Sequence, residues 1–175
     1  MSWSIAGGWA ISIFIGYEIR KHKDIEIAIL RRDQLALQRY LKNWEFKKVI
    51  PDTGEMEIWK NGEYLELPVH EIHAYNINYD PSALEILLNE SNENEWVFRR
   101  NPEISRPISK LGIQSKMRIP ILSPEIILLY KAKNPNNQDE TDFNTIYKLL
   151  NKEQRNWLKE SIKVCYPEHP WLDIL

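Results

Sequence analysis

The chain has 175 residues, 43% of them hydrophobic, and a formal net charge of −2 at pH 7. This length suits one domain, and the near-neutral charge excludes a chain built for non-specific attraction to nucleic acid or to an acidic membrane surface. A single cysteine, Cys165, excludes an internal disulfide and predicts a reducing, cytoplasmic location. The start Met-Ser-Trp-Ser lacks the basic segment of a signal peptide, and the apolar run at 11–15 is too short to span a bilayer.

The N-terminal half alternates apolar segments with loops and turn signals, which predicts an α/β arrangement. The expected elements are a strand at 3–6, a helix at 8–15, a charged loop at 16–23, a strand at 24–30, a helix at 34–42 with Asp33 as N-cap, and a strand at 44–50. Asn61-Gly62 then predicts a hairpin between 55–59 and 64–67, whereas 68–81 reads as irregular. Periodicity does not decide between helix and strand for Leu84–Leu88.

From Pro124 the apolar residues recur with the period of a helix. Helices are expected at 125–133, 139–150 and 152–166, with Ser123 and Asn151 as possible caps. The sequence therefore predicts a core at residues 1–122 followed by a small C-terminal helical bundle at 123–175.

Two features near the N-terminus indicate a binding site for a metal ion and a phosphate group. Asp24 and Glu26 lie two apart in a predicted strand, so their carboxylates share one face and repel each other. Folded proteins tolerate this electrostatic repulsion mostly where a divalent cation or basic groups lie between the two carboxylates. Gly7 and Gly8 open the predicted helix, where a phosphate can approach the backbone N–H groups. A phosphate cradle beside paired carboxylates is the arrangement that a metal–nucleotide complex needs.

Three segments together resemble a known family. They are Gly7-Gly8-Trp9, Arg20-x-His22-x-Asp24-Ile25-Glu26 and Trp96-Val97-Phe98-Arg99-Arg100. The chain resembles the nucleotidyltransferase superfamily of DNA polymerase β, and within it the aminoglycoside and lincosamide nucleotidyltransferases and their bacterial relatives. The resemblance implies a polymerase-β-like mixed sheet of the α/β (α+β) class. It also implies that 82–89 forms a strand paired with 95–100.

The resemblance further implies a two-metal Mg²⁺ site and a nucleoside triphosphate, most simply ATP, as the donor. Asp24 and Glu26 match the metal ligands of the family. A third carboxylate on a neighbouring strand completes such sites as a ligand or general base; Glu85 matches it best, and Glu66, in an equally apolar segment, is the alternative. The nucleotide would contact a set of backbone and basic groups: Gly7, Gly8, Arg20, His22 and Lys131.

Other residues favour structural interpretations. We expect Trp9 in the core, at most one of Arg99 and Arg100 facing the site, and Lys133 either near the triphosphate or in solvent. The acidic residues that open the second C-terminal helix are expected to stabilise its N-terminus; they are Asp139, Glu140 and Asp142. The histidines show no metal-ligand spacing; they include His70, His73 and His169.

The expected function is Mg²⁺-dependent transfer of a nucleoside monophosphate to a hydroxyl of a small molecule, such as an aminoglycoside-like or lincosamide-like antibiotic, with neither nucleic acid nor membrane as a partner. A protein-modifying enzyme of the toxin–antitoxin kind and a non-catalytic nucleotide-binding relative are the alternatives. Two departures from the family pattern weaken any inference about the acceptor. Ser12 stands where many resistance enzymes carry an acidic residue, and Glu26 where the named enzymes carry aspartate.

Overall fold

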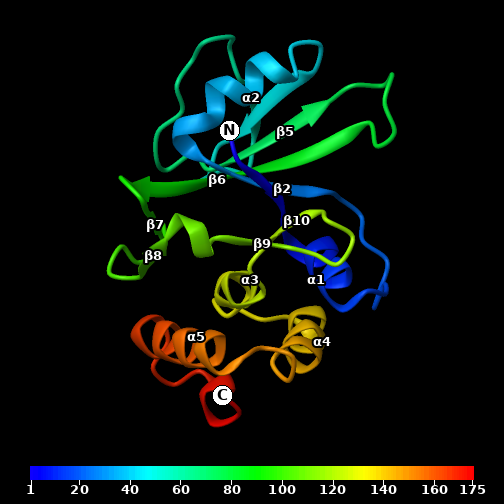
Figure 1. Cartoon of the computed structure of the whole chain (residues 1–175). Helices are drawn as coiled ribbons and strands as arrows, with labels where there is room; N and C mark the ends of the chain where they lie inside the picture. Colours follow the sequence, from blue (N-terminus) through cyan, green and yellow to red (C-terminus); the bar gives the residue numbers. More distant parts are fainter.

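The computed structural model describes residues 1–175, which form one mixed β-sheet with helices on both faces (Figure 1). The strand order is β4-β3-β5-β6-β2-β1-β10-β9, and β7 joins β6 to β8 at the side. The β2–β6 and β1–β10 pairs are parallel, and the other pairs are antiparallel. The strands are β1 Trp3–Ile5, β2 Glu26–Leu30, β3 Glu45–Val49, β4 Met56–Ile58, β5 Glu71–Tyr75, β6 Ala83–Asn92, β7 Glu95–Val97, β8 Ser105–Pro107, β9 Gly112–Gln114 and β10 Pro120–Leu122.

The helices divide unequally between the two faces of the sheet. Helix α2 lies on one face, whereas α1 and α3 lie on the other, with α4 and α5 beyond them (Figure 1). The α-helices are α1 Gly7–Ile15, α2 Gln34–Tyr40, α3 Pro124–Lys131, α4 Asn137–Ile146 and α5 Lys152–Cys165. Short 3₁₀ turns occupy Arg31–Asp33, Ile108–Lys110 and Pro170–Asp173. None of these helices has the length and apolar character that crossing a membrane requires.

Successive side chains of the central strands point to opposite faces of the sheet and belong to two separate hydrophobic clusters. Ile29 of β2 and Ile86 of β6 pack with Leu37 of α2 in the smaller cluster. Ala28 of β2 belongs to the larger cluster on the opposite face. That cluster continues through helices α1 and α3 to Leu158 of α5, so apolar burial joins residues on both sides of position 122. The division at 122 stays a prediction.

Local sequence signals explain where several helices begin and end. Helix α1 ends at Gly16, whose positive φ of 91° only glycine adopts without strain, and the Gly16 N–H donates to the Ser12 carbonyl. Asn136 and Asn151 start α4 and α5 with reciprocal capping boxes. Asp33 and Ser123 occupy the N-cap positions of α2 and α3 as expected, but their side chains make no cap hydrogen bond.

The predicted hairpin across Asn61-Gly62 is wrong, because strand β4 pairs with β3 and no strand follows it before β5. Backbone N–H groups of this segment donate to side chains of helix α2 and not to a neighbouring strand. The Gly62 N–H donates to Gln38 Oε1 (2.8 Å), and the Leu65 N–H donates to Gln34 Oε1 (2.7 Å). Two buried glutamines therefore hold this segment as a loop.

Strand β5 was not predicted from the sequence, because it lies within the segment 68–81 that was expected to be irregular. Its core-facing side chains, Ile72 and Ala74, are fully buried, and polar residues alternate with them. In β2, the strand begins at Glu26, so Asp24 lies in the preceding bend and not on the strand itself.

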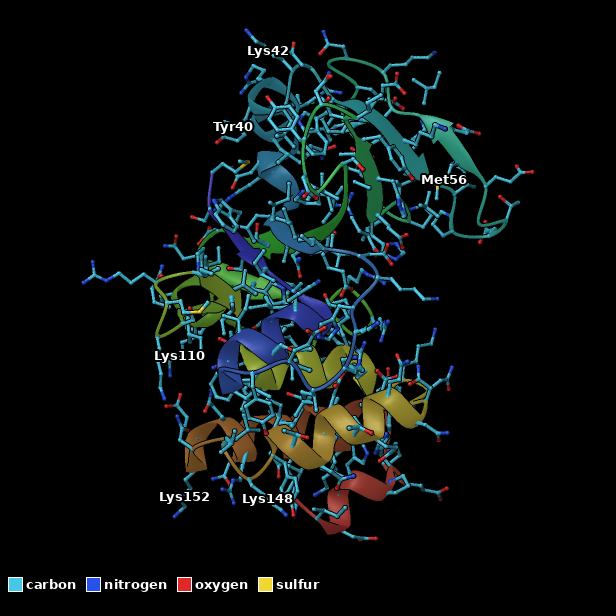
Figure 2. All side chains as sticks on the ribbon, turned by 90° about the vertical axis from the view of Figure 1, so that its right-hand side faces the viewer. Tyr40, Lys42, Met56, Lys110, Lys148 and Lys152 are labelled. Atoms are coloured by element: carbon cyan, nitrogen blue, oxygen red, sulfur yellow. The ribbon has the colours of Figure 1, made fainter.

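The labelled lysines lie in different parts of the molecule in the side-chain view. Lys42 projects at one end, Lys110 near the middle, and Lys148 and Lys152 at the other end (Figure 2).

Candidate active site

A row of polar side chains crosses three adjacent strands on the face that carries α1 and α3. Glu26 of β2 is the register partner of Glu85 of β6, and Glu85 is in turn the partner of His73 of β5. Cross-strand partners point to the same side of a sheet, so these three side chains are neighbours. Asp24, from the bend before β2, lines the same cavity as Glu26 and Glu85.

Strand β5 adds a carboxylate to this row. Glu71 and His73 lie two apart on β5, and Glu71 Oε1 is 2.9 Å from His73 Nε2. Ligand atoms of Glu71, His73 and Glu85 all lie within 4.8 Å of one another. The sequence shows no metal-ligand spacing around His73 and so did not reveal this cluster, because strand β5, which was not predicted, brings Glu85 beside Glu71 and His73 from a separate part of the chain.

Burial and neighbouring carboxylates perturb the ionisation of Glu85 and Glu26. Burial, followed by the charges of Glu71 and Glu26, raises the pKa of Glu85 to about 7. Burial also raises the pKa of Glu26, although Lys131 and the Gly8 N–H favour its charged form. The cluster consequently favours any cation that enters it.

The glycine pair makes room for side chains of the site. A Cβ on Gly7 would lie 1.3 Å from Glu26 Oε2, and the positive φ of 55° at Gly7 also favours glycine. A Cβ on Gly8 would lie 2.4 Å from His22 Nδ1 and 2.8 Å from Arg20 Nη2. The Glu26 carboxylate and the loop at 20–22 thus pack against the start of α1, where the sequence predicts a phosphate.

His22 is fixed from two sides. Its Nε2 is 2.8 Å from Ser12 Oγ, and its ring centroid is 4.9 Å from that of Trp9. Burial and the neighbouring Arg20 lower the pKa of His22, which favours the neutral ring. Trp9 is half-buried on His22 and joins neither hydrophobic cluster, so its expected place in the core is wrong.

Two carboxylates of α4 hold the cations nearest to Glu26. Asp142, whose side chain is 0% exposed, accepts from Lys131 Nζ (3.0 Å) and Arg20 Nη2 (3.3 Å). Asp139 accepts from Lys131 Nζ at 2.6 Å and also takes part in the α4 capping box. Burial alone would lower the pKa of Lys131, but these two carboxylates outweigh it and raise the pKa.

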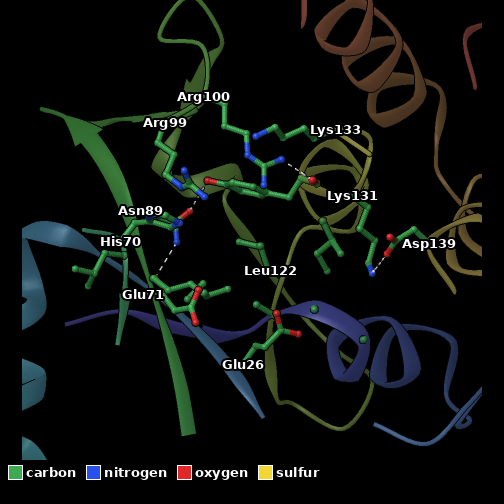
Figure 3. A pocket seen from close by; sticks show the side chains of 18 of the residues that line it. Glu26, His70, Glu71, Asn89, Arg99, Arg100, Leu122, Lys131, Lys133 and Asp139 are labelled. Carbon is green, nitrogen blue, oxygen red and sulfur yellow. Dashed lines mark hydrogen bonds and ion pairs between the residues drawn. The ribbon is translucent and has the colours of Figure 1, made fainter. Parts of the chain in front are cut away.

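A cavity of about 450 Å³ extends from Glu26 along the sheet (Figure 3). Arg99 and Arg100 lie together at the end opposite Glu26, beside Asn89, while Lys131 contacts Asp139 at the side. Both arginines line the cavity. The expectation that only one would do so is wrong, because β7 ends at Val97 and the arginines follow it in a turn.

The geometry distinguishes the two candidates for a third carboxylate. Glu85 faces Glu26 across the parallel strands, whereas Glu66 is exposed in the loop between β4 and β5. Sequence reasoning missed Glu71, because the strand that carries it was missed, and assigned Asp142 only to a helix start. The alternation of polar and apolar residues in Glu71–Tyr75 was the available signal for β5. Nothing local indicated that Asp142 is buried.

The fold and the site define the class of protein: it is a nucleotidyltransferase, with a Gly-Gly helix start beside carboxylates on adjacent strands. The family model of aminoglycoside-2''-adenylyltransferase matches residues 1–146. The chain therefore belongs to the aminoglycoside-2''-adenylyltransferase family and is an enzyme. This confirms the family resemblance seen in the sequence. A comparison of the sequence with curated proteins gives no match.

Solved structures share the fold at low sequence identity. The lincosamide antibiotic adenylyltransferase LnuA, solved with lincomycin, has 18% identity and a TM-score of 0.55 over 85% of this chain and 87% of that chain. ANT(2'')-Ia, solved with adenylyl-2''-tobramycin, has 18% identity and a TM-score of 0.60 over 94% of this chain and 88% of that chain. A solution structure of ANT(2'')-Ia gives 18% identity and a TM-score of 0.58 over 94% and 83% of the two chains. The expected fold class is confirmed.

Proposed function

We propose that the enzyme transfers a nucleoside monophosphate, AMP from ATP in the first instance, to a hydroxyl group of a small molecule in a Mg²⁺-dependent reaction. The observation that carries this proposal is the register of Glu26 and Glu85 on neighbouring parallel strands, with Asp24 lining the same cavity. Membership of an adenylyltransferase family supports ATP as the donor.

The donor set fits Mg²⁺, which prefers oxygen ligands and shares its coordination shell with substrate phosphates. Asp24, Glu26 and Glu85 offer only carboxylate oxygens. Burial is the main cause of the raised pKa values of Glu26 and Glu85, and neighbouring carboxylates add to both shifts; a divalent cation would favour the ionised forms. Asp24 and Glu26 are the proposed ligands, with Glu85 as a further ligand or a base. Bound Mg²⁺ would neutralise phosphate charge and assist in-line displacement at the α-phosphate.

Residues of the chain supply the remaining steps. Glu85, with a pKa of about 7, suits a general base at neutral pH, so it accepts the proton of the acceptor hydroxyl. The acceptor oxygen then forms a bond to the α-phosphorus, and the bond between the α- and β-phosphates breaks to release pyrophosphate. The N-terminus of α1 at Gly7-Gly8, with Arg20, His22 and Lys131, forms the proposed triphosphate subsite.

The test is calorimetric binding of Mg·ATP together with pyrophosphate release from each of the four nucleoside triphosphates, with and without Mg²⁺. Asp24→Asn and Glu26→Gln should each abolish Mg²⁺-dependent binding while the fold is retained. Glu66→Gln, an exposed carboxylate outside the cavity, is the matched control and should bind normally. Unchanged Mg·ATP affinity in both site variants would show that the metal assignment is wrong.

A further inference from the structure

Three side chains on strands β5 and β6 form a compact group of nitrogen and oxygen donors. Glu71, His73 and Glu85 each offer one ligand atom, and these atoms all lie within 4.8 Å of one another. Donor atoms bound to one ion at about 2.0–2.2 Å lie about 3–4.4 Å apart, so small side-chain rotations bring all three onto a shared cation. We call these three residues the His–Glu cluster.

The sheet holds the His–Glu cluster in place. Glu71 and His73 project from the same face of β5, because they lie two residues apart. His73 and Glu85 are register partners on the antiparallel strands β5 and β6, so their side chains are neighbours on that face. Behind them, Ile72 is 0% exposed in the core. A site carried by paired strands is positioned more precisely than one on a loop.

The His–Glu cluster is open to solvent on one side. The side chains of His73 and Glu71 are 22% and 30% exposed. His73 and Glu85 line a cavity of about 240 Å³, and Glu71 lines the larger cavity that contains Glu26 (Figure 3). An ion can therefore enter from solvent, and water can complete its coordination.

The protein itself does not balance the charge of the cluster. The His73 ring contacts Glu71 Oε1 at 2.9 Å, and Glu85 forms no ion pair within the protein. Even a protonated imidazole neutralises only one of the two carboxylates. A divalent cation would neutralise both and use the imidazole nitrogen as a neutral donor.

The donor set differs from that of the proposed Mg²⁺ site. Mg²⁺ prefers oxygen ligands in a near-octahedral shell, whereas an imidazole nitrogen suits Zn²⁺ and related ions. Three protein donors with a further position open to water are typical of accessible zinc sites. Glu71 and His73 also lie outside the three segments that the chain shares with the nucleotidyltransferases.

We propose that Glu71, His73 and Glu85 form a binding site for a divalent transition-metal ion, Zn²⁺ in the first instance, in addition to the Mg²⁺ site. Glu85 is common to both sites, since it also faces Glu26 across β2 and β6. A Glu85 carboxylate that is bound to Zn²⁺ no longer accepts a proton, so Zn²⁺ inhibits transfer. This inhibition rests on the proposed function, whereas the binding of the ion does not.

Calorimetric titration of the full chain with Zn²⁺ and, separately, with Mg²⁺ tests the site. The chain carries no affinity tag, and nucleotide is absent. One Zn²⁺ ion should bind at least about a hundredfold more tightly than Mg²⁺. His73→Gln and Glu71→Gln should each weaken Zn²⁺ binding at least about tenfold, because even groups that only orient metal ligands typically contribute that factor. His70→Gln is the matched control, since His70 contacts the Pro68 carbonyl oxygen outside the cluster.

Two measurements separate this site from the nucleotide site. Glu26→Gln should retain Zn²⁺ binding, and His73→Gln should retain Mg·ATP binding. Co²⁺ used in place of Zn²⁺ should give visible absorption bands with the unaltered protein and with His70→Gln, but not with His73→Gln. Added Zn²⁺ should suppress pyrophosphate release by the unaltered protein and spare His73→Gln.

Equal affinity for Zn²⁺ and Mg²⁺ would overturn the inference, as would Zn²⁺ binding that survives both His73→Gln and Glu71→Gln. Loss of Zn²⁺ binding in Glu26→Gln but not in His73→Gln would assign the ion to the nucleotide site and overturn it too. Transfer that Zn²⁺ leaves unchanged would contradict the sharing of Glu85. Failure of the unaltered protein to bind Mg·ATP would instead overturn the proposed function and leave the Zn²⁺ result standing.

Discussion

Replacing Glu85 by glutamine tests two effects of this carboxylate separately: its effect on the free energy of unfolding and its effect on the transfer rate. The side chain is partly buried beside Glu71 and Glu26, and its pKa rises from 4.5 to about 7. At about 1.4 kcal/mol per pKa unit, this rise corresponds to at most about 3.5 kcal/mol of native-state strain when the group is ionised. Because the carboxyl group is only partly shielded from solvent, we expect a little less than half of that, roughly 1.5 kcal/mol.

The direction in which stability changes with pH follows from proton binding to Glu85 in the folded and unfolded states. Between pH 4.5 and 7, the folded protein holds the Glu85 proton while the unfolded chain releases it, so the metal-free protein loses stability as pH rises through this window. Glutamine cannot ionise. Glu85→Gln should therefore match the unaltered protein at about pH 4.5 and exceed it at pH 8 by about 1.5 kcal/mol, or about 3–6 °C in melting temperature.

The assay is thermal unfolding in a chelating buffer at both pH values, with Glu66→Gln as the exposed control that should show no difference. With Mg·ATP, Glu85→Gln should still bind if Glu85 is the base, and should lose about a hundredfold or more in transfer rate. If Glu85 is a ligand, binding and rate should fall together. Equal stability at pH 8, or a gain that is the same at pH 4.5, would refute the electrostatic reasoning.

Two further perturbations test how the site is held. Gly7→Ala should destabilise the protein by about 2 kcal/mol in urea denaturation and abolish Mg·ATP binding, because the new methyl group collides with the Glu26 carboxylate. Gly62→Ala has a similar positive φ but open space around it, so it should cost only about 1 kcal/mol and leave binding intact. Asp142→Asn should destabilise by about 3 kcal/mol, since it removes a fully buried counter-charge, whereas Glu153→Gln, at an exposed pair, should change nothing measurable. Comparable losses in the members of either pair would contradict these assignments.

The sequence predicted the parts of the site that lie in continuous segments. Gly7-Gly8 opens a helix and Glu26 lies on a strand, because short-range periodicity and glycine placement determine such features. The hairpin across Gly62 failed for a tertiary reason: glutamines of α2 bind its backbone, and a buried side-chain amide leaves no trace in a local turn pattern. Strand β5 was not predicted although its residues alternate, because only two of the five, Ile72 and Ala74, face the core.

The roles of charged residues were harder to predict than the elements that carry them. Asp142 has the same local signature as any acidic residue early in a helix, and only the packing of α4 against the 16–25 loop shows that it is buried against Arg20. Arg99 and Arg100 were assigned opposite directions by strand alternation. Strand β7 ends two residues before Arg99, so that rule no longer applied.

The ion pairs formed within the fold determine which charged side chains remain free to bind a ligand. The net charge of the chain does not show this distribution. The net charge of −2 suggests no preference for an acidic or a basic partner. Asp139 and Asp142 neutralise the cations beside Glu26, and Arg99 at the other end keeps an uncompensated charge. The cavity is therefore polarised, with carboxylates suited to a metal at one end and guanidinium groups suited to an anion at the other.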